Sequence, residues 1–170
     1  MTHPAFSKSE YDRRLSLTRT AMAERGIDIL FVTDPSNQAW LTGYDGWSFY
    51  VHQGVIVTLD RDPIWWGRMM DMFGGRRTCW MSHENIIGYG DHFIQSTEFH
   101  PMADLARIIK DMGYETARLG VELENYYYSA KAHLILTSEL PNATVIDATA
   151  LVNWQRLIKS ADEIAFIEKA

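Results

Sequence analysis

The stretch that decides the fold runs from Gly43 to Asp71 and reads GYDGWSFYVHQGVIVTLDRDPIWWGRMMD. The apolar and aromatic residues from Phe49 to Leu59 predict one long strand. Asp60 to Pro63 has the Asp and Pro content of a tight turn, and Ile64 to Gly67 predicts the return strand. Such a hairpin places two antiparallel strands in the middle of the chain, so the sheet is predicted to be mixed rather than purely parallel.

Helices and strands alternate on both sides of this hairpin, and helical periodicity, capping residues and glycine stops define them. Residues 69–77 are ambiguous, because the pair Gly74-Gly75 weakens a helix. The alternation predicts an α/β domain of three layers, with a mixed, mostly central β-sheet flanked by helices. The other predicted elements are a helix over 7–25, a strand over 27–32, a short helix after 34–37 that ends at 43, a strand over 85–89, a helix over 101–112, a strand over 118–123, a helix over 126–137, a strand over 144–146 and a helix over 148–157.

Length, composition and charge define the class of protein. The chain has 170 residues, of which 46% are hydrophobic and 22% charged, and this is the balance of one globular domain with a core. The net charge of −6 argues against a nucleic-acid partner and against binding to an anionic membrane. Cys79 is the single cysteine, and the sequence shows neither a signal peptide nor a membrane-length apolar run, so we expect a cytoplasmic protein.

The C-terminal stretch SADEIAFIEKA, Ser160 to Ala170, begins a further helix. Ser160 and Glu163 have the spacing of a capping box, and Ile164 and Ile167 begin an apolar stripe. No Gly, Asn or Pro ends this helix. We therefore expect the sequence to be the front part of a longer protein, with a frayed terminal helix as the alternative interpretation.

Catalytic motifs are missing from the sequence. There is no phosphate-binding loop, dinucleotide-binding glycine pattern or G-x-S-x-G elbow, and His83-Glu84 lacks the second histidine of a zinc helix. Cys79 is interpreted as a small buried hydrophobe rather than a nucleophile. Asp91-His92 is interpreted as part of a surface loop rather than an acid–base pair, because adjacent strand residues face opposite sides. The sequence therefore favours a supporting or recognition domain over a complete enzyme.

The aromatic residues of the hairpin allow two interpretations. A strand continuing from Trp47 would carry Trp47 and Phe49 on one face and Tyr50 and His52 on the other. The rings could simply cover both faces of a central strand beneath helices. Alternatively they form a surface patch with the return strand, since aromatic residues and Arg are enriched at interface centres and aromatic faces attract cationic or amidinium groups. The glycine at position 54 marks a bulge or a close approach of another backbone.

Several segments resemble the N-terminal domain of the creatinase/prolidase/aminopeptidase P family, whose catalytic "pita-bread" domain follows it. The resemblance covers essentially the whole sequence and rests on DILFV, on the N-x-x-W-L-T-G-Y segment at Asn37–Tyr44, and on the junction RLIKSADEI at Arg156–Ile164. Within the family, GYDGWSFYVHQGV, WWGRMMD, ENIIGYGDHFIQS and GVELENYYYSAKAH are similar to hydrolases of a cyclic amidine rather than to proline peptidases.

The resemblance implies a family-type domain over 1–158, with a ribonuclease H-like motif, and over 159–170 the junction and first helix of a catalytic domain. The family's catalytic residues lie in that second domain, so no catalytic residue, metal or cofactor is expected in this chain. The longer protein would be metal-free, as in creatinase, or bind two divalent metals, as in the Xaa-Pro peptidases. Expected partners are its own catalytic domain, a second subunit and a small polar substrate. A freestanding binding or oligomerisation module remains a further alternative.

In the family this domain packs within a dimer, and its strand region reaches over the partner's active site. Aligned on Gly54, Phe49 matches a substrate-contacting aromatic of creatinase, whereas Val51 stands where creatinase has an Arg, and Arg68 is the candidate to replace it. The residues predicted to contact the substrate or the partner's pocket are Trp47, Phe49, Tyr50, His52, Trp65 and Arg68.

Overall fold

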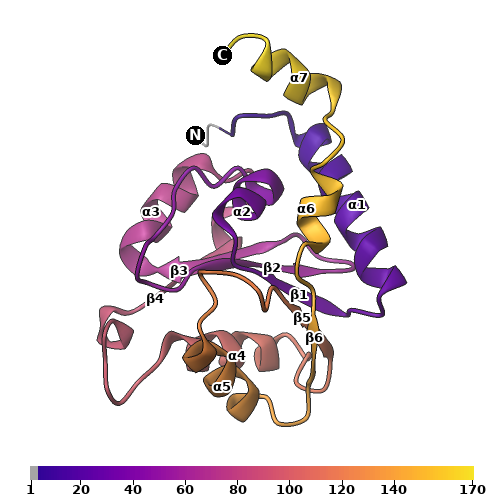
Figure 1. Ribbon diagram of the computed structural model, residues 1–170. Coiled ribbons are helices and arrows are strands. Elements are labelled where there is room, and N and C mark those ends of the chain that lie inside the picture. Colours follow the sequence, from indigo (N-terminus) through magenta and orange to yellow (C-terminus); the bar gives the residue numbers. More distant parts are fainter. Residues whose placement is uncertain (1–3) are drawn as a thin grey trace.

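The computed structural model describes residues 4–170 and is built around a six-stranded sheet (Figure 1). The strand order is β4-β3-β2-β1-β5-β6. β2 runs antiparallel to both of its neighbours, and every other pairing is parallel, so the mixed sheet that the hairpin predicted is confirmed. The strands are β1 (Ile29–Val32), β2 (Gly54–Thr58), β3 (Ile64–Arg68), β4 (Ile86–Tyr89), β5 (Arg118–Val121) and β6 (Thr144–Asp147).

Helices cover both faces of the sheet, which gives the three predicted layers (Figure 1). One face carries α1 (Lys8–Glu24), α2 (Pro35–Thr42), α3 (Met69–Thr78) and α6 (Leu151–Gln155), and the other carries α4 (Pro101–Asp111) and α5 (Ala130–Glu139). The last helix, α7 (Ala161–Ile167), lies beyond the first helical layer, near the N-terminal segment. Short 3₁₀ turns, η1 (His83–Asn85) and η2 (Asp91–Phe93), flank β4.

The strands are apolar on both faces because each face is covered by helices. In β1, Phe31 packs toward α4 and α5, while the next residue, Val32, packs in the core beneath α1 and α2. The two tryptophans of β3 divide in the same way: Trp65 joins the core beneath α1 and α2, and Trp66 joins the opposite one. The Trp66 indole N–H donates to Asp104 of α4 at 2.9 Å, which satisfies its buried polar atom.

The predicted strand over 49–59 is wrong in its first half. Only Gly54–Thr58 is a strand, and residues 45–53 form an irregular loop. β1 pairs with β2 from Thr58 back to Val55 and then turns into α2, so no backbone is left on that side to pair with the earlier residues. Glycine at position 54 does mark a close approach, since a Cβ there would lie 2.4 Å from the Phe31 ring.

Two predicted helices begin later than predicted, and one ambiguous stretch is a helix; the helix predicted over 148–157 is the shorter α6, Leu151–Gln155. The helix predicted over 126–137 begins only at Ala130, because Ser129 caps it by accepting the amide N–H of Ala132 at 3.1 Å. The ambiguous stretch 69–77 is the helix α3 in spite of its two glycines. Gly75 lets this helix pack closely on the sheet, since a Cβ there would come within 3.0 Å of Ile86. Within the described part of the chain, no helix has the length and apolarity needed to cross a bilayer.

Candidate functional site at the carboxyl edge of the sheet

One edge of the sheet collects the loops that carry the predicted contact residues. β1, β3, β4, β5 and β6 are parallel and end at this edge, and the antiparallel β2 begins there. In open α/β sheets, ligands bind in crevices at the carboxyl ends of the strands. The loop 45–53 before β2, the segment 90–100 after β4 and the loop 122–129 after β5 all lie at this carboxyl edge.

The loops before β2 and after β5 together build a surface aromatic patch, which we define as the exposed Trp47, Phe49 and Tyr126 and the half-buried Tyr127. Ring centroids are 6.1 Å apart for Trp47 and Phe49, 6.0 Å for Phe49 and Tyr126, and 6.3 Å for Trp47 and Tyr127. Trp47 is 59% exposed and Tyr126 is 73% exposed. Rings that contact one another yet remain open to solvent form a surface suited to a partner.

Tyr50 and His52 lie beside the aromatic patch and line two small cavities, of about 230 and about 270 Å³. The His52 ring lies 5.1 Å from the ring of His100, the residue that caps α4. Burial lowers the pKa of His52, and a hydrogen bond with the backbone of Tyr127 opposes that shift. His52 therefore faces the interior of the edge, whereas the Tyr50 side chain is largely exposed.

Arg68, the last residue of β3, is engaged within the chain. Its guanidinium donates to both carboxylate oxygens of Asp91, with Nε to Oδ1 at 2.8 Å and a terminal nitrogen to Oδ2 at 3.1 Å. This fork-like pairing lowers the pKa of Asp91. The neighbouring His92 packs instead against Phe93, at 4.2 Å between ring centroids, so Asp91 and His92 do not form an acid–base pair.

Trp65 does not belong to this surface. It is fully buried in the core and packs against Tyr44, with 4.8 Å between ring centroids. Trp66, the other ring of β3, is also fully buried. Because β3 is an interior strand covered on both faces, Trp65 has no exposed surface with which to contact a substrate or a neighbouring subunit. The expectation that Trp65 makes such a contact is wrong.

Tyr126 and Tyr127 are functional candidates that the sequence did not single out, because the predicted helix over 126–137 includes them, whereas α5 begins only at Ala130. The side chain of Asn125 accepts the amide N–H of Tyr127 at 2.9 Å, and its carbonyl accepts that of Tyr128. This is the turn that an Asn after a strand favours. Together with the strong capping residue Ser129, it was a signal that the tyrosines precede the helix rather than belong to it.

A buried acidic side chain, Glu122, links two of the segments that meet at the carboxyl edge. Glu122 follows β5 and is only 3% exposed. Its Oε2 accepts the backbone N–H groups of Thr33 at 2.7 Å and Asp34 at 2.8 Å, and its Oε1 accepts the side-chain amide of Asn37 at 2.6 Å. Burial raises the pKa of Glu122, while these three donors act in the opposite direction. The network ties the end of β5 to the start of α2.

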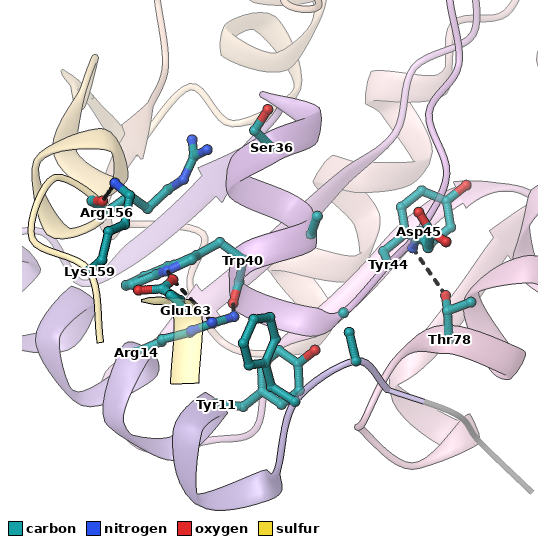
Figure 2. Close-up of a pocket in the computed structure, with 14 residues that line it drawn as sticks. Tyr11, Arg14, Ser36, Trp40, Tyr44, Asp45, Thr78, Arg156, Lys159 and Glu163 are labelled. Carbon is teal, nitrogen blue, oxygen red and sulfur yellow. Dashed lines mark hydrogen bonds and ion pairs between the residues drawn. The ribbon is translucent and has the colours of Figure 1, made fainter. Parts of the chain in front are cut away.

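A second polar cluster holds α7 against the domain, and Figure 2 shows Arg14, Trp40 and Glu163 converging at it. Arg14 is buried and donates to Glu10 at 2.9 Å, to the Trp40 carbonyl at 3.0 Å and to Glu163 at 3.1 Å. The Trp40 indole also donates to Glu163, at 2.7 Å. The predicted capping box of Ser160 and Glu163 is confirmed. The cluster lines a cavity of about 520 Å³ and holds the start of α7 against α1 and α2.

The remaining candidate for chemistry, Cys79, is fully buried, as the sequence predicted. Burial raises the pKa of its thiol to about 12, so it is not a nucleophile near neutral pH. Across residues 4–170, no three His, Cys, Asp or Glu side chains gather as a metal-binding group.

The family of the chain follows from its sequence pattern, and the three-layer fold agrees with it. The chain belongs to the Creatinase/Prolidase N-terminal domain family, whose pattern matches residues 14–158.

Among individual proteins, the chain is 53% identical over 166 residues to ectoine hydrolase from Halomonas elongata, which is 97% of this chain and 42% of that protein. It is 27% identical to creatinase from a Bacillus species, over 97% of this chain and 38% of that protein. The chain thus spans less than half the length of these relatives. Among solved structures, Xaa-Pro dipeptidase from Bacillus anthracis has the same fold, with a TM-score of 0.69 at 19% identity over 94% of this chain and 39% of that one.

Proposed function

We propose that the chain is the non-catalytic N-terminal domain of a pita-bread-family hydrolase, most like ectoine hydrolase, that cleaves a C–N bond of a cyclic amidine. In this proposal it takes part in dimerisation, and its aromatic patch caps the active site of the partner subunit. The observation that carries the capping role is the patch itself, which is exposed and lies at the edge where sheets of this class bind ligands. The identity to ectoine hydrolase over 97% of the chain supports the substrate class.

The chemistry of the patch suits this role. Aromatic faces attract cationic and amidinium groups, and flat rings exclude water from a small polar ligand. Arg68 is already paired with Asp91, so in this proposal it orders the edge rather than meeting the substrate. Catalytic groups, and any divalent metals, belong to the following domain: two metals if that domain is of the Xaa-Pro peptidase type, none if it is of the creatinase type. The proposal places the enzyme in the cytoplasm.

Steady-state kinetics of the longer protein tests the proposal. Trp47→Ala and Tyr126→Ala each remove a ring of the aromatic patch, and we expect kcat/KM for ectoine to fall about tenfold or more, the effect of losing an interface anchor. Leu59→Ala is the matched control, because this residue is 42% exposed and follows β2 at the opposite edge of the sheet.

Kinetics of both patch variants equal to the control would refute the capping role. If the longer protein hydrolyses Xaa-Pro dipeptides and not ectoine, the substrate class proposed here is wrong. The same variants, assayed with an Xaa-Pro dipeptide, then test the capping role.

A further inference from the structure

A small cavity beside the aromatic patch has the features of a binding site for an anion. It has a volume of about 230 Å³ and lies between the loop before β2, the segment after β4 and the first residues of α4 and α5. The polar groups at its wall include His52, His100, Ser129 and Lys131. The centroids of the two histidine rings are 5.1 Å apart. In the described part of the chain, no hydrogen bond joins the two rings.

Lys131 is the one charged side chain among the described residues that line this cavity, although the chain as a whole carries −6. Among the described residues that line it, there are two histidines and one lysine but no carboxylate. The helices α4 and α5 both begin here, so the positive ends of two helix dipoles add to the lysine charge. Burial, with smaller contributions from His52 and Lys131, lowers the pKa of His100 to about 4. An anion in the cavity would oppose this lowering, because a nearby negative charge favours the protonated imidazole.

The same features disfavour a metal ion. Lys131 repels a cation, and the wall offers no carboxylate to balance its charge. One ring nitrogen of His100 is also in use, since Nδ1 accepts the amide N–H of Met102 at 3.2 Å as the cap of α4. The lining also includes the apolar residues Val51, Phe93 and Phe99. A ligand that satisfies both kinds of lining group has one negative charge and a short hydrocarbon part.

We propose that this cavity binds a small monocarboxylate, whose carboxylate is held by His52, His100 and Lys131 and whose hydrocarbon part packs against Phe93 and Phe99. The titratable groups that line the cavity are these three and Tyr50. The inference goes beyond the capping role and does not depend on it, because the site is complete within this chain.

Nuclear magnetic resonance of the 170-residue chain tests the proposal directly. Propionate is the probe, and propionamide is its neutral counterpart of nearly the same shape. We expect propionate to shift the imidazole signals of His52 and His100 saturably, and propionamide to leave them nearly unchanged. His100→Asn removes the ring but keeps a good capping residue, and Lys131→Gln removes the charge; each should weaken propionate binding about tenfold, the contribution of one charge-assisted hydrogen bond.

Lys110→Gln is the matched control, because it removes the same charge from α4 where that lysine pairs with Glu139 of α5. It should leave propionate binding unchanged. Non-saturating shifts, equal responses to propionate and propionamide, or full affinity in both His100→Asn and Lys131→Gln would overturn the proposal. This experiment needs no catalytic domain, so its failure would leave the capping role untouched, and the reverse also holds.

Discussion

The buried carboxylate of Glu122 gives the sharpest test of how the carboxyl edge is held. Glu122→Gln keeps the shape of the side chain but replaces one accepting oxygen with an N–H₂ donor. If the new oxygen keeps the two backbone N–H groups of Thr33 and Asp34, the new amide nitrogen faces the amide nitrogen of Asn37, which now lies 2.6 Å from Oε1. Asn37 cannot turn over to relieve this, because its own oxygen accepts from Arg156 at 2.7 Å.

The cost follows from these contacts. The new amide and the amide of Asn37 each leave a buried N–H without an acceptor, and two charge-assisted hydrogen bonds become neutral ones, which together destabilise the fold by about 2–3 kcal/mol. For a domain of this size the expected fall in melting temperature is about 5–10 °C. Thermal unfolding followed by circular dichroism measures it. Glu124→Gln, the same change at an exposed position of the same loop, should move the midpoint by no more than about 2 °C.

A shift for Glu122→Gln as small as that of the control would refute this reasoning. It would mean that the carboxyl group is already protonated in the folded chain, so that glutamine replaces it without loss. Burial favours that protonated form and the three N–H donors favour the carboxylate, so the experiment decides between them.

Three further predictions follow from single residues. Gly54→Ala should destabilise the chain by about 1–3 kcal/mol, because its Cβ would lie 2.4 Å from Phe31. Gly74→Ala has open space around it on α3, so it should be neutral or stabilise the chain by up to about 1 kcal/mol. Denaturant unfolding measures both changes in the free energy of unfolding. Cys79, with a thiol pKa of about 12, should resist iodoacetamide in the native chain at pH 8 and react after unfolding, and native labelling seen by mass spectrometry would contradict its burial. The pKa of His100 is lowered from 6.5 to about 4, so the unfolded chain binds this proton at a higher pH than the folded chain does. The free energy of unfolding should therefore fall as the pH drops from about 6.5 to about 4. His100→Asn should flatten that part of the stability–pH profile, and an unchanged profile would count against the lowered pKa.

The fold was predictable where local chemistry and tertiary packing favour the same element. Ser7 caps α1, Asp34 caps α2 and Ser160 caps α7, as their side chains indicated. The turn between β2 and β3 likewise produced the mixed sheet. The loop 45–53 was not predictable, because its residues have strand composition and only the short length of β1 leaves them without a partner.

The candidate site was predictable only in part, because tertiary packing decides which of its aromatic residues reach the surface. Trp47 and Phe49 are on the surface and in contact, yet they reach it from a loop and not from the predicted strand. Trp65 is a core residue because helices cover β3 on both faces: α3, which follows directly in the sequence, packs against Trp65, and α4, more than thirty residues further on, packs against Trp66. Tyr126 completes the patch from residues more than seventy positions away, and no local pattern reports that pairing.

The central claim is that the aromatic patch covers an active site on another subunit. Site-specific photo-crosslinking from position 47 in the longer protein tests it most directly, with the two subunits distinguished by isotope labelling. Trp47 is 59% exposed in this domain, so a probe there has free access to a neighbour. The account predicts crosslinks to the catalytic domain of the other subunit, weakened when substrate or a competitive inhibitor fills the site. Crosslinks confined to residues 1–170 of the same subunit would contradict it.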